Sequence, residues 1–247
     1  MSILRCRQCV LAAVFIAIAE AAWPQGSTSA STPALSVGQI VEQMQLHDQA
    51  RNRELLSYHS LRHYAVEYRG FFTDVAATMD VEVNYDKASG KHLQIVFQSG
   101  SGFLIDKVLK HAVDSEIEAS RNKALTALTP ANYRFNLLGS EIVGDRPSYV
   151  LDVEPLHESK FLYRGKIWVD VADFAVTRMD TQPSKSPSFW IARTLIQCKY
   201  AKTSDFWLPQ ELRSETSVRL GGHAVLTIDY GQYEITRNPL QNLQLNR

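Results

Sequence analysis

Cysteine is scarce in this chain. Of the three cysteines among 247 residues, Cys6 and Cys9 lie within the first ten positions, and Cys198 alone lies further along. One cysteine cannot form an internal disulfide, so a disulfide framework is excluded and the fold must be held by its apolar core. Cys198 lies in a strand-like stretch with no neighbour in sequence that would activate it, which favours a buried, inert thiol over a nucleophile.

The chain also lacks an excess of charge of either sign. Its 26 lysines and arginines balance 26 aspartates and glutamates. Nucleic acids and anionic membrane surfaces are bound by clustered cations. We therefore expect no nucleic acid partner and no polybasic membrane patch.

Motifs that carry chemistry are missing as well. There is no G-x-S-x-G or H-E-x-x-H motif, and the seven histidines are scattered. His59 and His63 are four residues apart, a ligand spacing that suits a helix, but they lie where a strand begins. An S-x-x-K pattern at Ser120 reads as a solvated helix end, and Asp170 and Asp173 flank a turn that acids tighten. We expect a protein that is not an enzyme, with no catalytic residues, no metal and no cofactor.

The apolar run near the N-terminus is too short to span a bilayer. It extends from Val10 to Ala19, follows Arg5 and Arg7, and ends at Glu20, with alanines at positions 19 and 21. This layout predicts a cleaved secretory signal peptide over residues 1–21, with an uncleaved membrane anchor as the alternative. Export places the protein where ATP is absent, which excludes kinases and P-loop motors.

The rest of the chain predicts one domain between two weakly patterned segments. A Ser/Thr/Pro-rich leader covers residues 22–35, the domain covers 36–235, and a tail covers 236–247. Ser36 and Gln39 form a capping box that predicts a helix from Ser36 to Leu55. A second helix is expected from Asp106 to Asn122, where apolar residues recur at helical spacing.

Alternating apolar and polar residues predict the strands. The clearest pattern puts Met79, Val81 and Val83 on one face of a strand, and Leu93, Ile95 and Phe97 repeat it after a turn. From Tyr133 onward only strands and short turns are expected. About ten antiparallel strands and two helices predict a mainly β (α+β) fold: a strongly curved antiparallel sheet, or unclosed β-barrel, with helices covering its mouth.

A curved sheet of this size has a concave face that one helix does not fill, and such mouths hold apolar ligands. The candidate lining of a hydrophobic cavity comes from the two alternating strands: Met79, Val81, Val83, Leu93, Ile95 and Phe97. Ordinary core packing is the alternative for all six side chains, and the sequence alone does not decide between them.

Three segments of the second half resemble one family in their order and spacing. The first runs from Gly144 to Pro155, the second from Tyr163 to Arg178, with G-K-I-W-V-D inside it, and the third ends in F-W-L-P at Phe206 to Pro209. They resemble the corresponding hairpins of LolA-like outer-membrane lipoprotein-sorting proteins. The resemblance covers about Gln39 to Tyr233.

The resemblance implies an open antiparallel barrel with helices as a lid, and a periplasmic carrier for the acyl chains of lipoproteins or for another lipid. It also implies an arginine on an early strand that holds the lid shut, for which Arg62 and Arg69 are the candidates. Phe71 and Phe72 are the nearest match to the family's membrane-inserting loop. A membrane-bound donor or acceptor protein is a possible partner. The alternative is an envelope sensor that binds lipid or lipoprotein and regulates a membrane partner.

Overall fold

A computed structural model describes residues 35–71, 73–186, 191–219 and 221–238. The signal peptide, the leader up to residue 34, Phe72, the Phe189-Trp190 pair and the tail from residue 239 lie outside the described residues. The remaining elements form one unit that begins at Leu35.

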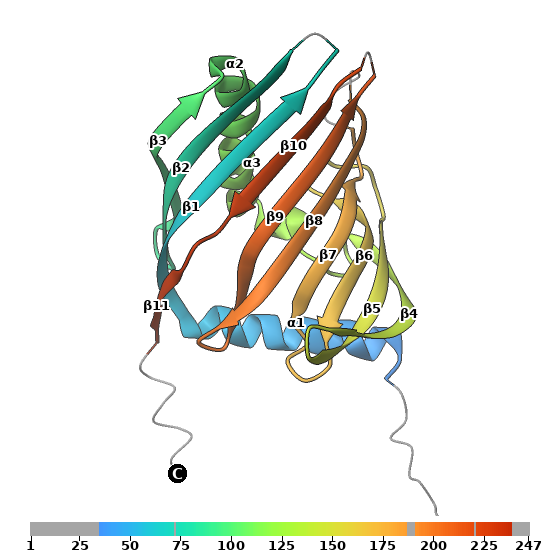
Figure 1. The fold of residues 1–247 in the computed structure, drawn as a ribbon. Coiled ribbons are helices and arrows are strands. Elements are labelled where there is room, and N and C mark those ends of the chain that lie inside the picture. The colour runs from blue at the N-terminus through green and yellow to red at the C-terminus, as the bar shows by residue number, and fades with distance from the viewer. Residues whose placement is uncertain (1–34, 72, 187–190, 220, 239–247) are drawn as a thin grey trace, which may run out of the picture. The chain divides into compact units, whose positions relative to one another are not determined.

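The chain folds into a single eleven-stranded antiparallel sheet with a helix at its start and a helical connection in its middle (Figure 1). The helical elements are α1 (Val37–Glu54), α2 (Gly102–Leu104), the π-helical turn η1 (Ile105–Leu109), α3 (Lys110–Arg121) and α4 (Lys123–Thr126). The strands are β1 (Leu55–Arg69), β2 (Asp74–Asp86), β3 (Gly90–Gly100), β4 (Tyr133–Val143), β5 (Arg146–Pro155), β6 (Tyr163–Asp170), β7 (Val176–Pro183), β8 (Ile191–Thr203), β9 (Phe206–Val218), β10 (His223–Asp229) and β11 (Tyr233–Arg237).

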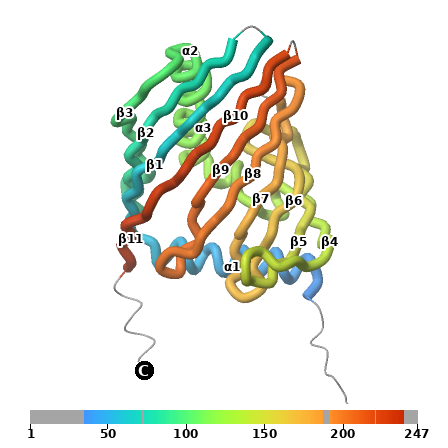
Figure 2. The backbone as a smooth tube through the Cα atoms, viewed as in Figure 1, coloured from blue at the N-terminus to red at the C-terminus, as the bar shows by residue number. Residues whose placement is uncertain are grey.

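The strand order is β3-β2-β1-β10-β9-β8-β7-β6-β5-β4, and the sheet does not close, so β3 and β4 are its two edges (Figure 2). The connection between these edge strands carries α2, η1, α3 and α4 across one face of the sheet. We call the face that contacts α1 and α3 the inner face. The prediction of an unclosed antiparallel barrel with helices over it is confirmed.

Local signals explain where the elements begin and end. The Ser36 hydroxyl accepts a hydrogen bond from the Gln39 backbone N–H (3.3 Å), and the Gln39 Oε1 accepts one from the Ser36 N–H (2.9 Å), as the capping box predicts. The last expected strand is interrupted at Gly231, where φ is +59° and a Cβ would lie 2.3 Å from the Leu61 carbonyl oxygen. The break gives two strands, β10 and β11, which pair with successive parts of β1.

The core has two clusters, one under each long helix. Under α3, side chains of β1, β2 and β10 pack against η1 and α3. Under α1, Ile40, Val41 and Met44 pack against buried residues of β5 and β6 such as Leu151 and Ile167. Each helix therefore covers its own part of the inner face.

Candidate functional site

The expected apolar wall exists on β2 and is covered by the helical connection. Met79, Val81 and Val83 are fully buried and belong to the cluster that includes Leu109 and Val113 of the helices. Leu93 of β3 packs at the margin of this cluster. Side chains of β1, β2, η1 and α3 pack against one another between the sheet and α3.

The alternation along β3 fails at its end, and Phe97 does not share the face of Leu93. The pairing of β2 and β3 shifts between Asp80 and Val81, because Val96 is an extra residue that forms a β-bulge. Ile95 stays opposite Val81 on the inner face but is 36% exposed, and Phe97 lies opposite Asp80 and is 53% exposed. The expectation that Leu93, Ile95 and Phe97 share one face is therefore wrong for Phe97.

The helix above the wall starts earlier than its periodicity predicts. Helical structure begins at Gly102 and passes through the π-helical turn before α3, so that Leu104, Ile105 and Leu109 all point into the core. A π-helical turn inserts one extra residue per turn and is a frequent feature of functional sites. Because of this extra residue, the apolar side chains before and after the π-helical turn face the same side, toward the sheet.

A partly buried ion-pair network joins α3 to the sheet. Arg62 on β1 donates from one terminal nitrogen to both carboxylate oxygens of Glu116, at 2.8 and 2.7 Å. Lys91 on β3 donates to the same carboxylate at 2.9 Å. The Arg62 side chain is only 2% exposed, and its guanidinium lies 4.6 Å from the centre of the Tyr230 ring.

Burial and charge act in opposite directions on these groups. Burial disfavours ionisation of Glu116, but the charges of Lys91 and Arg62 outweigh it and hold the pKa of Glu116 below its ordinary value. Burial likewise opposes the charged form of Lys91, and the carboxylate of Glu116 leaves its pKa raised. All three groups are therefore charged at neutral pH.

Arg69, the other candidate arginine, lies outside this network. Its side chain is 74% exposed, and its contact is with Glu67 on the same strand, at 3.4 Å. Phe71, in the turn between β1 and β2, is 78% exposed. Of the two arginines, Arg62 is the one that contacts a helix over the inner face.

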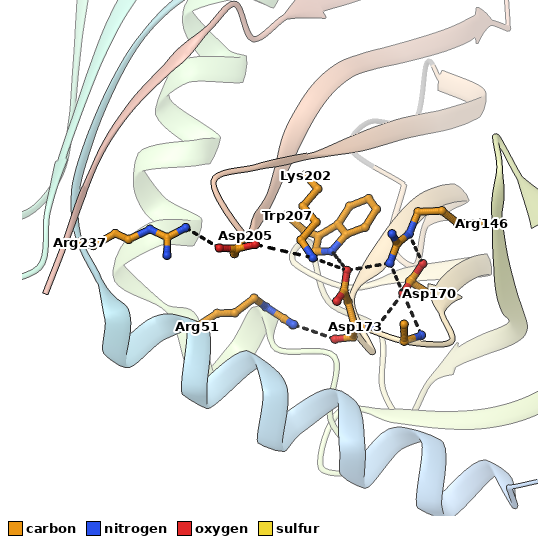
Figure 3. Close-up of polar contacts among 9 residues, drawn as sticks. Arg51, Arg146, Asp170, Asp173, Lys202, Asp205, Trp207 and Arg237 are labelled. Carbon is orange, nitrogen blue, oxygen red and sulfur yellow. Dashed lines mark hydrogen bonds and ion pairs between the residues drawn. The ribbon is translucent and has the colours of Figure 1, made fainter. Parts of the chain in front are cut away.

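Helix α1 is tied to the sheet at its C-terminal end. It runs into β1 without a linker, and Arg51 donates to the backbone carbonyl of Asp173 at 2.9 Å (Figure 3). The Asp173 carboxylate in turn accepts hydrogen bonds from Arg146, Lys202 and Trp207, at 2.9 to 3.0 Å. This network ties the end of α1 to three hairpins of the sheet.

The turn at Asp170 and Asp173 has the structural role that the sequence indicates. Asp170 is 1% exposed and accepts from the backbone N–H groups of Ala172 and Asp173 at 2.9 and 2.7 Å. It also forms a two-point ion pair with Arg146, at 2.5 and 2.9 Å. Burial disfavours its charge, but these donors hold its pKa below the ordinary value.

The described residues hold no group of three or more His, Cys, Asp or Glu side chains that could bind a metal ion. In the same part of the chain, no helix is long and apolar enough to cross a membrane. A hollow of about 400 Å³ on the outer face of the sheet is lined in part by charged side chains, among them Glu67, Arg69 and Arg213. The buried apolar side chains of β1 and β2 are on the inner face, under η1 and α3.

Cys198 on β8 is buried, and burial raises its pKa to about 11. Since the thiolate is the reactive form, a thiol reagent at pH 8 is expected to label the native protein roughly 100-fold more slowly than the protein in denaturant. The rate of absorbance change with an aromatic disulfide reagent measures the labelling rate in each of the two states. Labelling at similar rates in the two states would show that the thiol is accessible.

Glu116 and Lys91 are the site residues that sequence reasoning missed. Glu116 lies three residues after Val113 and seven after Leu109, so it falls within the apolar stripe of its helix. An acid in such a stripe is the sequence signal that could have found it. Lys91 follows the turn between β2 and β3, and nothing near it in sequence marks it as buried.

No family model matches the chain, and no curated protein matches it. Among solved structures, a DUF1329 family protein from Desulfovibrio piger is similar at 13% identity and a TM-score of 0.40, over 81% of this chain and 92% of the other. A putative outer membrane lipoprotein-sorting protein domain from Vibrio parahaemolyticus has 14% identity and a TM-score of 0.40, over 86% and 100%. A LolA superfamily protein from Nitrosomonas europaea has 14% identity and a TM-score of 0.36, over 84% and 97%.

Two of these three proteins carry names of the family that the hairpin motifs resemble. At identities of 14% or less and TM-scores of 0.40 or less, however, such likeness says nothing about what this chain binds.

Proposed function

We propose that this chain is a non-enzymatic carrier or binding protein for acylated ligands in the periplasm. The observation that supports it most is the buried apolar wall of Met79, Val81 and Val83 beneath η1 and α3. Each CH₂ group of an acyl chain costs roughly 0.8 kcal/mol when it is left in water. A carrier must offer such a chain apolar surface and still release it, which a movable lid permits.

In this proposal α3 is the lid and Arg62 its latch. Apart from apolar packing, α3 is held to the sheet by the Glu116 network and to the loop before β6 by an exposed ion pair between Glu118 and Lys160. Helix α1 continues into β1 and is tied to the hairpins through Arg51. When α3 lifts, the wall on β2 becomes accessible while α1 keeps the other half of the core covered.

The more specific role that we propose is the sorting of lipoproteins to the outer membrane, with a membrane-bound donor or acceptor as partner. One observation favours an envelope sensor instead. The edge strand β4 exposes Leu137, Leu138 and Ile142, and an unpaired apolar edge can take a strand from another protein. A sensor would bind its partner protein stably and retain lipid weakly.

Native mass spectrometry of the protein purified from the periplasm, before and after organic extraction, tests this proposal. We expect a bound acylated species that extraction removes and an added lipopeptide restores. A clean apo mass together with no uptake of added lipid or lipopeptide would contradict the carrier.

Met79→Trp is expected to weaken acyl binding about tenfold, because the larger ring takes the space along the β2 wall that a chain would occupy. Thr78→Trp is the matched control, since Thr78 lies next to Met79 on the same strand but faces the other side of the sheet. Displacement of a fluorescent fatty acid measures both variants. Equal affinities in two folded variants would remove this wall from the site.

A further inference from the structure

The network beneath α3 is unbalanced in charge. It contains two cations, Arg62 and Lys91, and one carboxylate, Glu116. Among the residues that the structure describes, no other acid is within ion-pair distance of either cation. Arg62 is buried and Lys91 is 21% exposed. Charges withdrawn from water are normally paired, so a surplus of one positive charge under a helix requires an explanation.

Polar atoms without partners lie beside the surplus charge. The Nε atom of Arg62 and the hydroxyl of Ser60 are buried and have no hydrogen-bond partner among the described atoms. Both side chains are almost completely inaccessible, and both point from β1 to the inner face. A buried donor without an acceptor is costly, and such atoms mark places where a ligand supplies the missing group.

The cations lie next to the apolar wall, an arrangement that complements the anionic head and the apolar chain of an amphiphile. In the sheet register Arg62 lies opposite Val81, and Ser60 lies opposite Val83. Lys91 is on β3, which pairs with β2 on the side away from β1. Lys91 and Arg62 both donate hydrogen bonds to the Glu116 carboxylate. Once α3 lifts, an apolar strip with two cations and a hydroxyl along its side is uncovered.

We infer that the Glu116 carboxylate stands in for an anionic group of the ligand, so that the protein selects acyl amphiphiles whose head carries a carboxylate or a phosphate. This inference rests on the proposed function. As α3 lifts, Glu116 leaves Arg62 and Lys91, and the anionic head takes its place. A neutral amphiphile would leave two cations together against an apolar wall without a counter-charge.

The test compares three ligands of one chain length below their aggregation limits: hexadecanoate, hexadecanol and 1-palmitoyl lysophosphatidate. Displacement of a neutral fluorescent probe measures each affinity. Hexadecanoate is expected to bind at least about tenfold more tightly than hexadecanol, since hydrogen bonds to charged groups are stronger than neutral ones. Lysophosphatidate binding more tightly than hexadecanoate would assign the head to phosphate, and the reverse order would assign it to carboxylate.

Three variants test which residues cause the preference for hexadecanoate over hexadecanol. Lys91→Gln is expected to reduce the ratio of hexadecanoate to hexadecanol affinity about tenfold, whereas Glu116→Gln is expected to increase it because the internal competitor is gone. Glu118→Gln removes an exposed carboxylate from the same helix and should leave the ratio unchanged. Equal binding of hexadecanoate and hexadecanol overturns the inference and leaves the carrier intact. Failure of all three ligands to bind contradicts both.

Discussion

Glu116→Gln is expected to destabilise the protein more than the loss of either cation that Glu116 contacts. The substitution leaves Arg62 and Lys91 together beneath α3 with no counter-charge, and removing one partner from a buried charge network costs about 3–5 kcal/mol. For a domain of this size, that corresponds to a fall in Tm of about 10 °C. Urea denaturation and thermal unfolding measure the change.

The two cation variants are the informative comparison. Arg62→Met leaves Lys91 paired with Glu116, and Lys91→Met leaves Arg62 paired with it, so each retains a neutral pair. We expect each to cost about 1–2 kcal/mol. Glu118→Gln, which removes an exposed ion pair on the same helix, should stay within about 0.5 kcal/mol of the parent. A cation variant less stable than Glu116→Gln would refute the charge count.

Asp170→Ala is expected to cost about 3 kcal/mol at neutral pH. The buried carboxylate holds Arg146 and the backbone N–H groups of Ala172 and Asp173, and without it these donors lose their acceptor. Asp145→Ala, an exposed position in the adjoining β4–β5 turn, is the matched control and should be near neutral. Chemical denaturation at pH 7 compares the two variants.

The same carboxylate predicts how stability depends on pH. The pKa of Asp170 is held below its ordinary value in the folded protein, so its contribution is complete above the unfolded-state pKa, near 4, and is lost as the pH falls through the folded pKa. The difference between the parent and Asp170→Ala should therefore shrink as the pH falls below about 4. A difference that stays constant down to pH 2 would show that Asp170 acts without its charge.

Short-range patterns predict most of the sheet because they depend on neighbours in sequence. Alternation along β2 correctly put Met79, Val81 and Val83 on one buried face, and the capping box set the start of α1. The bulge at Val96 and the break at Gly231 escaped this reasoning, since each depends on how one strand meets another.

The site was harder to predict than the fold. Arg62 and Glu116 are 54 residues apart in sequence, and Arg51 reaches a carbonyl 122 residues away, so no local pattern pairs them. The resemblance to a family with a latch arginine points to Arg62 only as one of two candidates, with Arg69 as the other. Glu116 could have been predicted from the sequence, because an acid in the apolar stripe of an expected helix needs a partner on the element against which the helix packs.

Hydrogen exchange measured by mass spectrometry, with and without a saturating acylated ligand, tests the central claim most directly. If α3 is the lid, amides of residues 102–121 should change their protection on binding, while those of α1, residues 37–54, stay the same and serve as the internal reference. A ligand that binds without altering exchange in residues 102–121, or that alters α1 instead, would contradict the account.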